Sequence, residues 1–395
     1  YFPFIVNGQA SETYPALSVG NDGQLWVLFE KQLWRFSNNS AFHLQEPDYR
    51  VDRAGNVLFQ DDQDNIWIGT LGYGLRKLSL RKSQFSAMLE GVSIWGVWQT
   101  KATGLLCKLF TKIVKYDPVS GKLSEQSAFP DALPQQNDLV FGPEGDHWLL
   151  CGLREGSVNK SEIRHYKADG SLLNSYKISI GRYPYARLLR ARDGAIWASG
   201  AYGILLRLEP ETGKQTIFDF GHLFGENVKT LMTLALVEDG RGRIWAGTQF
   251  GLVKATIRGD TMDFKLFTSD SPGGKALNNN SIACILPDPK QPENRLWIGT
   301  KGGGINCLDL LTESFSYITT EQGLPNNVVY GILPDNSGYL WCSTNRGLAK
   351  LPLSSSSMEQ ITLFTAGDGL QSNEFNTQAF FRADDGTLLF GGVNG

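Results

Sequence analysis

Apolar residues alternate with polar ones along most of this chain, in short runs that end at turn-forming residues about every 8 to 12 positions. Residues 57–61 and 331–335 are typical, because each is an apolar run that closes on an aspartate. No long stretch shows the period of about 3.6 residues that marks an amphipathic helix. The pattern therefore predicts a chain built from short antiparallel strands.

A tryptophan recurs at one place in these runs and sets the register of an internal repeat. A glycine usually stands three residues before this anchor, and in several repeats a second glycine follows two residues after it. Nine positions fit the register at spacings of about 40 to 52 residues, the range of propeller blades. They are Trp26, Trp67, Trp148, Trp197, Trp245, Trp297 and Trp341, with Cys107 and Leu389 where the indole is absent.

Each repeat divides into four predicted strands. Residues 57–61, 65–70 and 74–78 are the first three in one repeat, and residues 313–317 are a fourth, outer strand in another. A four-stranded sheet cannot bury both of its faces alone, so successive sheets are expected to stack around an axis. The anchor tryptophan would fill the wedge between neighbouring sheets, which is worth roughly 2–3 kcal/mol per buried indole. We therefore predict an all-β fold, a β-propeller of four-stranded antiparallel blades.

The best-formed repeats resemble the two-component regulator propeller repeat. In residues 65–75, 243–252 and 295–305, an aliphatic residue, the tryptophan and a glycine are followed by a Gly–Leu or Gly–Ile pair. Residues 323–328 and 369–373 are similar to the linker between blades in that family. The resemblance covers nearly the whole length and implies rings that usually have seven blades.

The resemblance also implies a function. Residues 390–395 resemble the close of the last propeller in such ectodomains, which precedes an immunoglobulin-like domain, a membrane helix and a histidine kinase. The chain is thus expected to be a periplasmic, extracytoplasmic ligand-sensing module of a membrane-anchored two-component sensor histidine kinase. Its expected partners are an oligosaccharide or other small-molecule ligand, an adjoining propeller, the immunoglobulin-like domain of the parent chain, and a second copy in a homodimer.

Nine repeats leave two domain arrangements open. Residues 1–395 form either one propeller region with an unusual blade number, or two parts with a boundary near residues 85–93 if the first two repeats belong to a preceding ring. The repeats between about residues 95 and 165 depart furthest from the pattern, since residues 101–115 have lost the tryptophan.

Composition narrows the function further. The net charge is −3 and no segment is strongly basic, so nucleic acid is not an expected partner. No apolar run reaches the roughly 18 residues of a membrane-spanning helix, and the first residues lack the basic region of a signal peptide. The five cysteines lie in apolar runs without a C-x-x-C pair, as expected of small core residues.

Little in the sequence points to catalysis. The four histidines, His43, His147, His165 and His222, form no metal-binding pair by spacing. The sequence has no nucleophile elbow, phosphate-binding loop or dinucleotide fingerprint. We therefore expect no catalytic residues, no metal and no cofactor, and we do not expect this chain to be an enzyme.

One rim of the ring is the predicted ligand-binding surface. In a four-stranded meander, the turn from the second to the third strand and the connection between blades lie on the same face. Aromatic, amide and arginine side chains there suit a sugar, because rings stack on sugar faces and amides bond hydroxyls. The alternative is that the rings pack on neighbouring loops and the asparagines cap turns. The candidate residues are Tyr73, Tyr183, Tyr185, Tyr202, Phe250 and Arg346.

Two other functions remain open beside ligand sensing. Enzymes of the streptogramin-lyase and lactonase type share propeller architecture, although they gather histidines and carboxylates at the axis. A protein-interaction scaffold would use the same rim as a sensor. A ligand screen on the isolated chain separates sensing from both.

Overall fold

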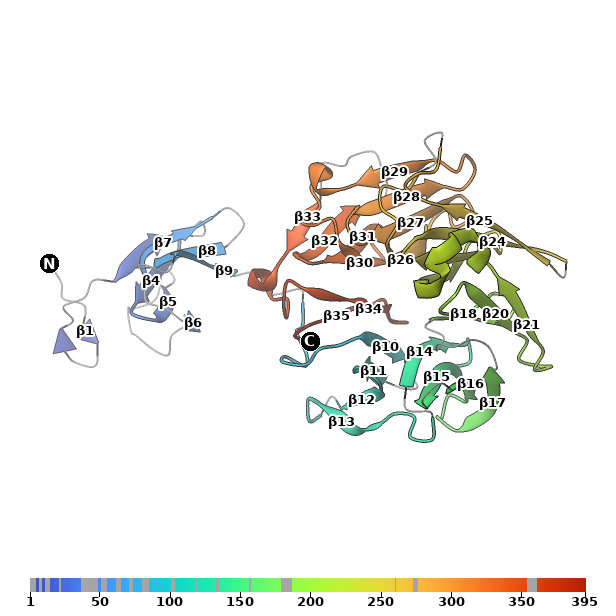
Figure 1. Cartoon of the computed structure of the whole chain (residues 1–395). Helices are drawn as coiled ribbons and strands as arrows, with labels where there is room; N and C mark the ends of the chain where they lie inside the picture. Colours follow the sequence, from blue (N-terminus) through green and yellow to red (C-terminus); the bar gives the residue numbers. More distant parts are fainter. Residues whose placement is uncertain are drawn as a thin grey trace. The chain divides into compact units, whose positions relative to one another are not determined.

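Short antiparallel strands make up nearly all of the regular structure, and the chain divides into two compact units (Figure 1). The computed structural model describes residues 5–6, 9–10, 15–20, 23–36, 49–50, 55–61, 65–70, 74–79, 85–100, 104–117, 119–132, 135–155, 158–178, 187–259, 261–272, 276–353 and 361–395. Unit 1 comprises Tyr1–Ser86 with Gly367–Leu370, and unit 2 comprises Ala87–Ala366 with Gln371–Gly395.

Unit 1 contains the repeats anchored by Trp26 and Trp67. Its strands are β1 (Ile5–Val6), β2 (Gln9–Ala10), β3 (Ala16–Val19), β4 (Leu25–Phe29), β5 (Gln32–Phe36), β6 (Tyr49–Arg50), β7 (Gly55–Gln60), β8 (Asn65–Thr70) and β9 (Gly74–Ser79). β3–β6 form one antiparallel sheet and β7–β9 the next. Trp26 is buried among Leu58, Ile66 and Ile68 of that next sheet, so the two repeats stack as blades do.

Unit 2 contains the other seven repeats, each as one sheet, which we number I to VII. Sheet I comprises β10 (Gly96–Thr100), β11 (Gly104–Lys108), β12 (Ile113–Asp117) and β13 (Lys122–Ser127). Sheet II comprises β14 (Gln135–Phe141), β15 (His147–Glu155), β16 (Val158–Tyr166) and β17 (Leu172–Ile178). Sheet III comprises β18 (Arg187–Arg190), β19 (Ile196–Ser199), β20 (Ile204–Leu208) and β21 (Gln215–Asp219). A 3₁₀ segment, η1 (Gly221–Thr230), connects sheets III and IV.

The remaining sheets continue the series. Sheet IV comprises β22 (Thr233–Glu238), β23 (Ile244–Thr248), β24 (Gly251–Arg258) and β25 (Thr261–Phe267). Sheet V comprises β26 (Ile282–Pro287), β27 (Arg295–Thr300), β28 (Ile305–Asp309) and β29 (Phe315–Ile318). Sheet VI comprises β30 (Val329–Pro334), β31 (Tyr339–Thr344), β32 (Gly347–Pro352) and β33 (Thr362–Phe364). Sheet VII comprises β34 (Phe375–Arg382) and β35 (Leu388–Gly392). The short 3₁₀ segments η2 (Thr320–Gln322) and η3 (Ala366–Asp368) precede sheets VI and VII.

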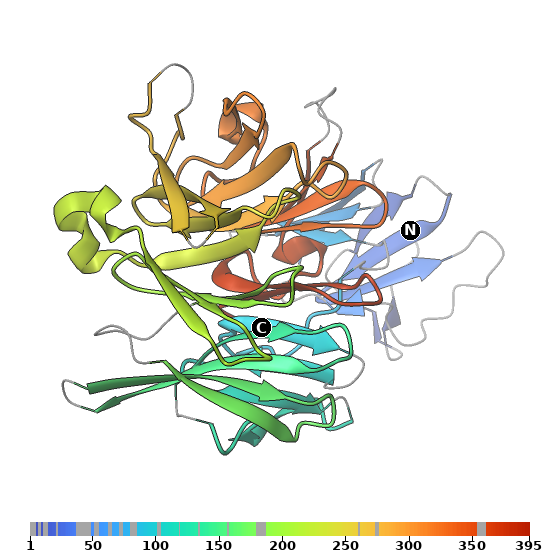
Figure 2. The same cartoon turned by 90° about the vertical axis from the view of Figure 1, so that its right-hand side faces the viewer.

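The seven sheets of unit 2 close into a ring, and Figures 1 and 2 show them following one another around a common centre. From sheet II to sheet VII the innermost strands of successive sheets lie side by side, and β34 packs between β30 and β10. Several hydrogen bonds join the ends of the ring, among them those from Ile94 N–H to Gly392 O at 2.9 Å and from Asn376 Nδ2 to Ile94 O at 2.8 Å. The prediction of an all-β propeller with four-stranded antiparallel blades is confirmed.

The anchor tryptophans fill the wedges between sheets, as predicted. Trp245 of sheet IV is fully buried in a cluster with Ile282 and Ile298 of sheet V, and its neighbours repeat this arrangement. The glycine two residues after the anchor makes room for the next sheet. A Cβ built on Gly247 would lie 2.5 Å from Cγ2 of Ile282, too close for any larger residue.

An aspartate at the end of the innermost strand holds the indole in four repeats. The indole Nε1 of Trp245 donates to Asp239 Oδ2 at 2.7 Å, and that of Trp297 donates to Asp288 Oδ2 at 2.9 Å. Trp67 and Trp341 make the same bond to Asp61 and Asp335. Because each carboxylate also accepts backbone N–H bonds within its turn, one residue fixes both the turn and the wedge.

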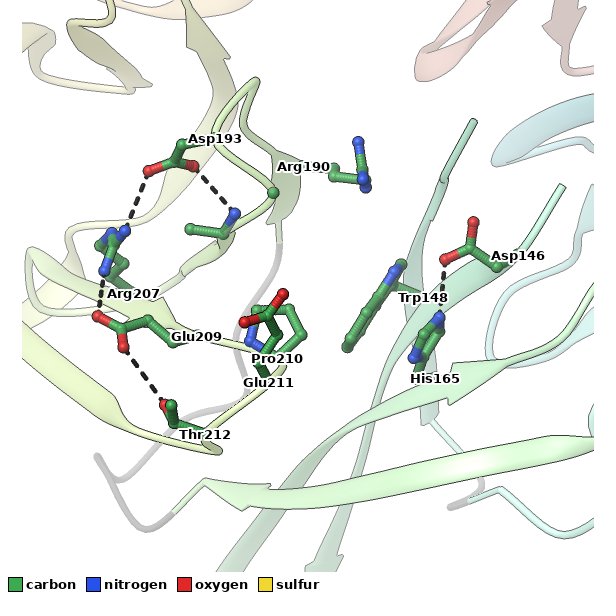
Figure 3. A pocket seen from close by; sticks show the side chains of 12 residues that line it. Asp146, Trp148, His165, Arg190, Asp193, Arg207, Glu209, Pro210, Glu211 and Thr212 are labelled. Atoms are coloured by element: carbon green, nitrogen blue, oxygen red, sulfur yellow. Dashed lines mark hydrogen bonds and ion pairs between the residues drawn. The ribbon is translucent and has the colours of Figure 1, made fainter. Parts of the chain in front are cut away.

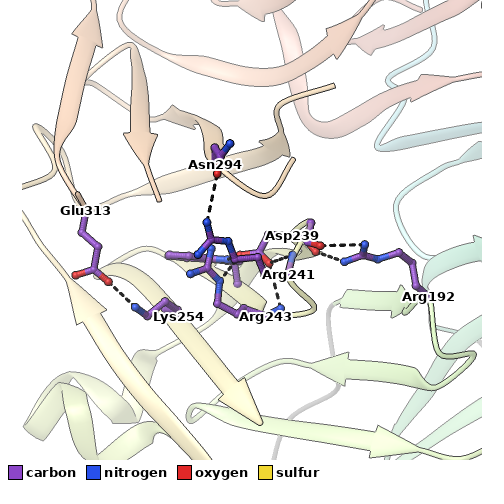
Figure 4. A network of polar contacts seen from close by, with 9 residues as sticks. Arg192, Asp239, Arg241, Arg243, Lys254, Asn294 and Glu313 are labelled. Atoms are coloured by element: carbon purple, nitrogen blue, oxygen red, sulfur yellow. Dashed lines mark hydrogen bonds and ion pairs between the residues drawn. The ribbon is translucent and has the colours of Figure 1, made fainter. Parts of the chain in front are cut away.

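Side chains on the same edge also connect neighbouring sheets (Figure 4). Arg192 of sheet III donates to the backbone oxygen of Asp239, and Arg241 of sheet IV donates to Asn294 Oδ1 of sheet V at 3.3 Å. Lys254 of sheet IV forms an ion pair with Glu313 of sheet V. The regular repeats of unit 2 are thus held together at this edge by both apolar and polar contacts.

Candidate functional site

The ring has two faces with different connections. We call the joining face the one on which successive sheets are connected and each second strand turns into its third. The Asp–Gly face is the opposite one, where each first strand turns into its second and each third into its fourth. The meander topology of the sheets fixes this division, because strand direction alternates from the axis outward.

The turns on the joining face are held by buried threonines. The hydroxyl of Thr248 donates to Gly251 O at 2.9 Å, that of Thr300 to Gly304 O at 3.0 Å, and that of Thr344 to Gly347 O at 2.8 Å. All three side chains are fully buried. Residues at the tips of these turns are therefore presented by a rigid backbone.

The structure describes three of the six candidate residues on this face, and each comes from a different sheet. Tyr202 follows sheet III's second strand, is half-buried and has a φ of 61°, while its N–H donates to Leu231 O at 3.0 Å. Phe250 is half-buried and packs on the core between sheets III and IV. Arg346 is exposed. Tyr73, Tyr183 and Tyr185 lie outside the described residues.

Asparagines on this face serve the turns themselves. Asn278 Nδ2 donates to Gly303 O at 2.6 Å, and Asn278 Oδ1 accepts from Asn306 Nδ2 at 2.7 Å. Asn327 Oδ1 accepts from the N–H of Thr320 at 2.8 Å. For these residues the turn-capping alternative describes the contacts, so they stabilise the turns of the joining face.

A cavity of about 550 Å³ lies at the axis of unit 2, between the innermost strands. Its walls are mostly apolar, and Trp98, Phe141, Phe380 and Phe381 supply the aromatic surface. Phe380 of sheet VII packs against Gly331 of the neighbouring sheet VI, where an added Cβ would lie 2.4 Å from the phenyl ring. A volume of this size is within the range of about 300–1,000 Å³ that is typical of small-molecule sites.

Three polar side chains line this axial cavity: Asp138, Arg187 and Gln378. Arg187 Nε donates to Leu234 O at 2.7 Å, and its Nη1 lies 3.5 Å from Asp138 Oδ2. Gln378 Nε2 approaches the same Leu234 oxygen at 3.4 Å. Asp138 and Arg187 occupy equivalent positions on neighbouring innermost strands, so the pair lies toward the joining face.

Burial changes the electrostatics of this cluster. It lowers the pKa of Arg187, while the carboxylate of Asp138 acts in the opposite direction. Burial also lowers the pKa of Lys108 to about 8, assisted by the charge of Arg187 and opposed by that of Asp138. A polar group entering the cavity would therefore meet charges that are only weakly hydrated.

Sequence reasoning missed the axial cluster, although a signal existed. The innermost strands of the other repeats are apolar at this level, as Ala235 and Cys284 illustrate. Asp138 and Arg187 interrupt that pattern in two successive repeats. Charged residues at positions that a repeat otherwise keeps apolar mark a place with a special role.

The histidines are dispersed. His147 is buried in sheet II, where burial lowers its pKa, and His165 lies opposite Trp148 on β16. His222 lies on the exposed side of η1, and His43 lies outside the described residues. Within the described ranges, no group of three or more His, Cys, Asp or Glu side chains is arranged to hold a metal ion. No helix there is long and apolar enough to span a membrane.

Fold and repeat together define the class. Residues 323–346 match the family model of the two component regulator propeller, and they cover the linker before sheet VI together with β30 and β31. This match confirms the resemblance inferred from the repeats. The chain therefore carries the two-component regulator propeller repeat on a β-propeller fold.

The chain is similar to parts of larger proteins of this class. It is 30% identical over 303 residues to Histidine kinase P4 of Formosa agariphila, an alignment covering 63% of this chain and 21% of the kinase. The extracellular domain of the hybrid two-component system BT3049 of B. thetaiotaomicron is 18% identical with a TM-score of 0.59, covering 99% of this chain and 52% of that domain. This chain thus spans about a fifth of the kinase and about half of the domain.

A third similarity concerns the fold alone. PorZ, a surface component of the type-IX secretion system of Porphyromonas gingivalis, is 14% identical with a TM-score of 0.50. The similarity covers 88% of this chain and 59% of PorZ.

Proposed function

We propose that this chain is a ligand-sensing propeller of an extracytoplasmic sensor region, and that it recognises an oligosaccharide or another small polar molecule over the joining face of unit 2. The observation that carries the proposal is the axial cavity, whose charged residues Asp138 and Arg187 lie toward that face. The similarity to a histidine kinase and to an extracellular sensor domain supports the sensing role.

The three described candidate residues lie on the joining face of unit 2, the face toward which the charged residues of the cavity lie. Arg346 is exposed on a turn that Thr344 fixes, and Tyr202 and Phe250 stand on turns of two other sheets. One ligand that contacts several sheets can alter how the ring docks on a partner, because a ligand shifts an equilibrium only by binding its two states differently. The ring itself is tightly packed, so the signal is transmitted by the placement of whole units and not by deformation of a sheet.

The proposal includes the larger protein. The two repeats of unit 1 belong to a preceding ring, and unit 2 is followed in the parent chain by an immunoglobulin-like domain, a membrane helix and the kinase. Contact with the adjoining propeller, or with a second copy in a homodimer, is what ligand binding would change. The module is placed outside the cytoplasmic membrane by this arrangement.

An oligosaccharide array followed by isothermal titration calorimetry tests the recognition surface. The triple variant Tyr183→Ala, Tyr202→Ala, Arg346→Ala should weaken binding of the selected ligand by about ten-fold or more, equivalent to about 1.4 kcal/mol. Arg258→Ala is the matched control, because Arg258 is an exposed arginine on the Asp–Gly face that pairs with Asp263.

Two results would contradict the proposal. One is unchanged affinity in a folded triple variant. The other is a ligand whose binding is lost only through substitutions on the Asp–Gly face. Thermal unfolding of each variant separates loss of binding from loss of fold.

A further inference from the structure

A second polar cleft, of about 370 Å³, lies between sheets II and III on the Asp–Gly face (Figure 3). Sheet II contributes Asp146, Trp148 and His165, which lie at the first-to-second turn and at the ends of the strands next to it. Sheet III contributes the end of β18 and its turns. The sheet III side chains that bear on binding are Arg190, Asp193, Arg207, Glu209, Glu211 and Thr212.

The repeat pattern is broken at this cleft. Where sheets IV to VI hold the anchor indole with an aspartate, sheet II has Gly142. A Cβ on Gly142 would lie 1.9 Å from Asp146 Oδ1, so the Asp146 carboxylate occupies the space that the aspartate of other repeats uses. That carboxylate pairs with His165 Nε2 at 2.7 Å and not with the indole.

The indole of Trp148 is consequently left with an unsatisfied donor. Trp148 is 2% exposed, and among the described residues its Nε1 has no hydrogen-bond partner. Its ring is stacked on that of His165, with centroids 3.7 Å apart and planes 11° apart. Leaving a buried N–H unpaired costs about 1–3 kcal/mol, so an acceptor that enters the cleft recovers this energy.

The charges of the cleft are paired, with two exceptions. Arg207 bridges Asp193 at 3.0 Å and Glu209 at 2.6 Å, and Glu209 also accepts from Thr212. The side chains of Arg190 and Glu211 form no ion pair or hydrogen bond within the part of the chain that the structure describes. The cleft therefore offers one unpaired cation, one unpaired carboxylate and one unpaired buried donor.

We propose that this cleft binds a small zwitterion of the size of a dipeptide. Its carboxylate would pair with Arg190 and accept from Trp148 Nε1, and its ammonium group would pair with Glu211. A simple anion fits less well, because the remaining side chains are already acidic overall: Asp146, Asp193 and Glu209 face only Arg207 and His165. The volume is at the small end of the range for ligand sites, about 300–1,000 Å³. This site is separate from the joining face and does not depend on the sensing proposal.

Matched probes test the charge pattern on the unaltered chain. Alanylalanine should bind in isothermal titration calorimetry, whereas N-acetyl-alanylalanine lacks the ammonium group and alanylalanine amide lacks the carboxylate. We expect each blocked probe to bind at least about ten-fold more weakly, equivalent to about 1.4 kcal/mol. Equal binding of a blocked probe, preferential binding of a neutral sugar, or no binding of alanylalanine would each overturn the proposal.

Variants locate the probe. Arg190→Gln and Trp148→Phe should each weaken the binding of alanylalanine by about ten-fold. Glu211→Gln should weaken the binding of alanylalanine but leave the affinity for N-acetyl-alanylalanine unchanged. Arg258→Gln is the control, as an exposed arginine on the same face. If Arg190→Gln does not fold, Trp148→Phe keeps the ring and still decides the question. Unchanged affinity in folded Arg190→Gln and Trp148→Phe would place the probe elsewhere and overturn the assignment.

Discussion

Sheets I to III and sheets IV to VI of unit 2 share one topology but differ in how their repeats are stabilised. In sheets IV to VI an aspartate accepts from the anchor indole, and the innermost strands present apolar side chains such as Ala235 and Cys284 to the axial cavity. In sheets I to III the anchor is Cys107, Trp148 or Trp197, the aspartate is absent, and Asp138 and Arg187 line the axis.

The difference shows which contacts the propeller fold requires and which are particular to some of its sheets. Packing of the wedge persists in sheet II, where Trp148 is buried with Leu188 and Ile196 of sheet III, although its hydrogen bond is gone. Burial of apolar side chains therefore stabilises the packing between sheets, and the hydrogen bond from the indole to the aspartate is not required for it. The axial charges and the cleft at Arg190 both lie in sheets I to III, where the aspartate–indole hydrogen bond is absent. This is expected if these three sheets are used for recognition.

The largest effect should come from removing a wedge-filling ring in the regular half. Trp245→Ala should lower the free energy of unfolding by about 3–5 kcal/mol, because it leaves a cavity beside Ile282 and Ile298 and removes one donor from the Asp239 carboxylate. Urea unfolding measures this loss. A decrease in the free energy of unfolding of less than about 1 kcal/mol would be inconsistent with an indole that fills the space between these sheets.

Phenylalanine substitutions isolate the hydrogen bond from the packing. Trp245→Phe leaves Asp239, which is 1% exposed, with one donor fewer, whereas Trp148→Phe removes a donor that has no partner among the described residues. Trp245→Phe should therefore cost about 1–3 kcal/mol more than Trp148→Phe in urea unfolding. Equal costs would show that the two halves do not differ in the way the contacts indicate.

The axial charges of sheets I to III should give unfolding a distinctive dependence at alkaline pH. The folded pKa of Lys108 is about 8, below its usual value, because of burial and the charge of Arg187. Between about pH 8 and pH 10.5 the unfolded chain binds more protons, so stability should rise with pH in this window. Lys108→Met should flatten the rise, and an unchanged profile would refute the placement of this amine.

The smallest effect is expected at the exposed edge of the regular half. Burial raises the pKa of Glu313, but hydrogen bonds from Lys254 and Lys265 dominate and lower it to about 2. Its stabilising contribution is complete above pH 4.5 and is lost as the pH falls toward about 2. Glu313→Gln should make acid unfolding less steep there. A steeper acid transition would contradict the pairing.

Much of the fold was readable in the sequence because the repeat is local. The anchor, the glycine before it and the apolar run that precedes both lie within about a dozen residues, and each blade uses them in the same way. The strands around Trp245, Trp297 and Trp341 lie where the pattern predicted them. The sequence does not decide the role of the candidate rim residues, since a tyrosine or phenylalanine on a turn serves packing as readily as recognition. Phe250 packs on the core, whereas Arg346 is exposed.

The sequence alone determined the class of fold, the strands and the wedge-filling residues, because periodic apolar positions and glycine turns act over short distances. Only the tertiary structure decided that seven repeats close into unit 2 and that Asp138 and Arg187 meet at its axis. It also brought Trp148 and Arg190 to one cleft from different sheets. The proximity of side chains from different sheets depends on how the sheets stack around the ring. This stacking is set by the sum of many contacts between residues distant in sequence.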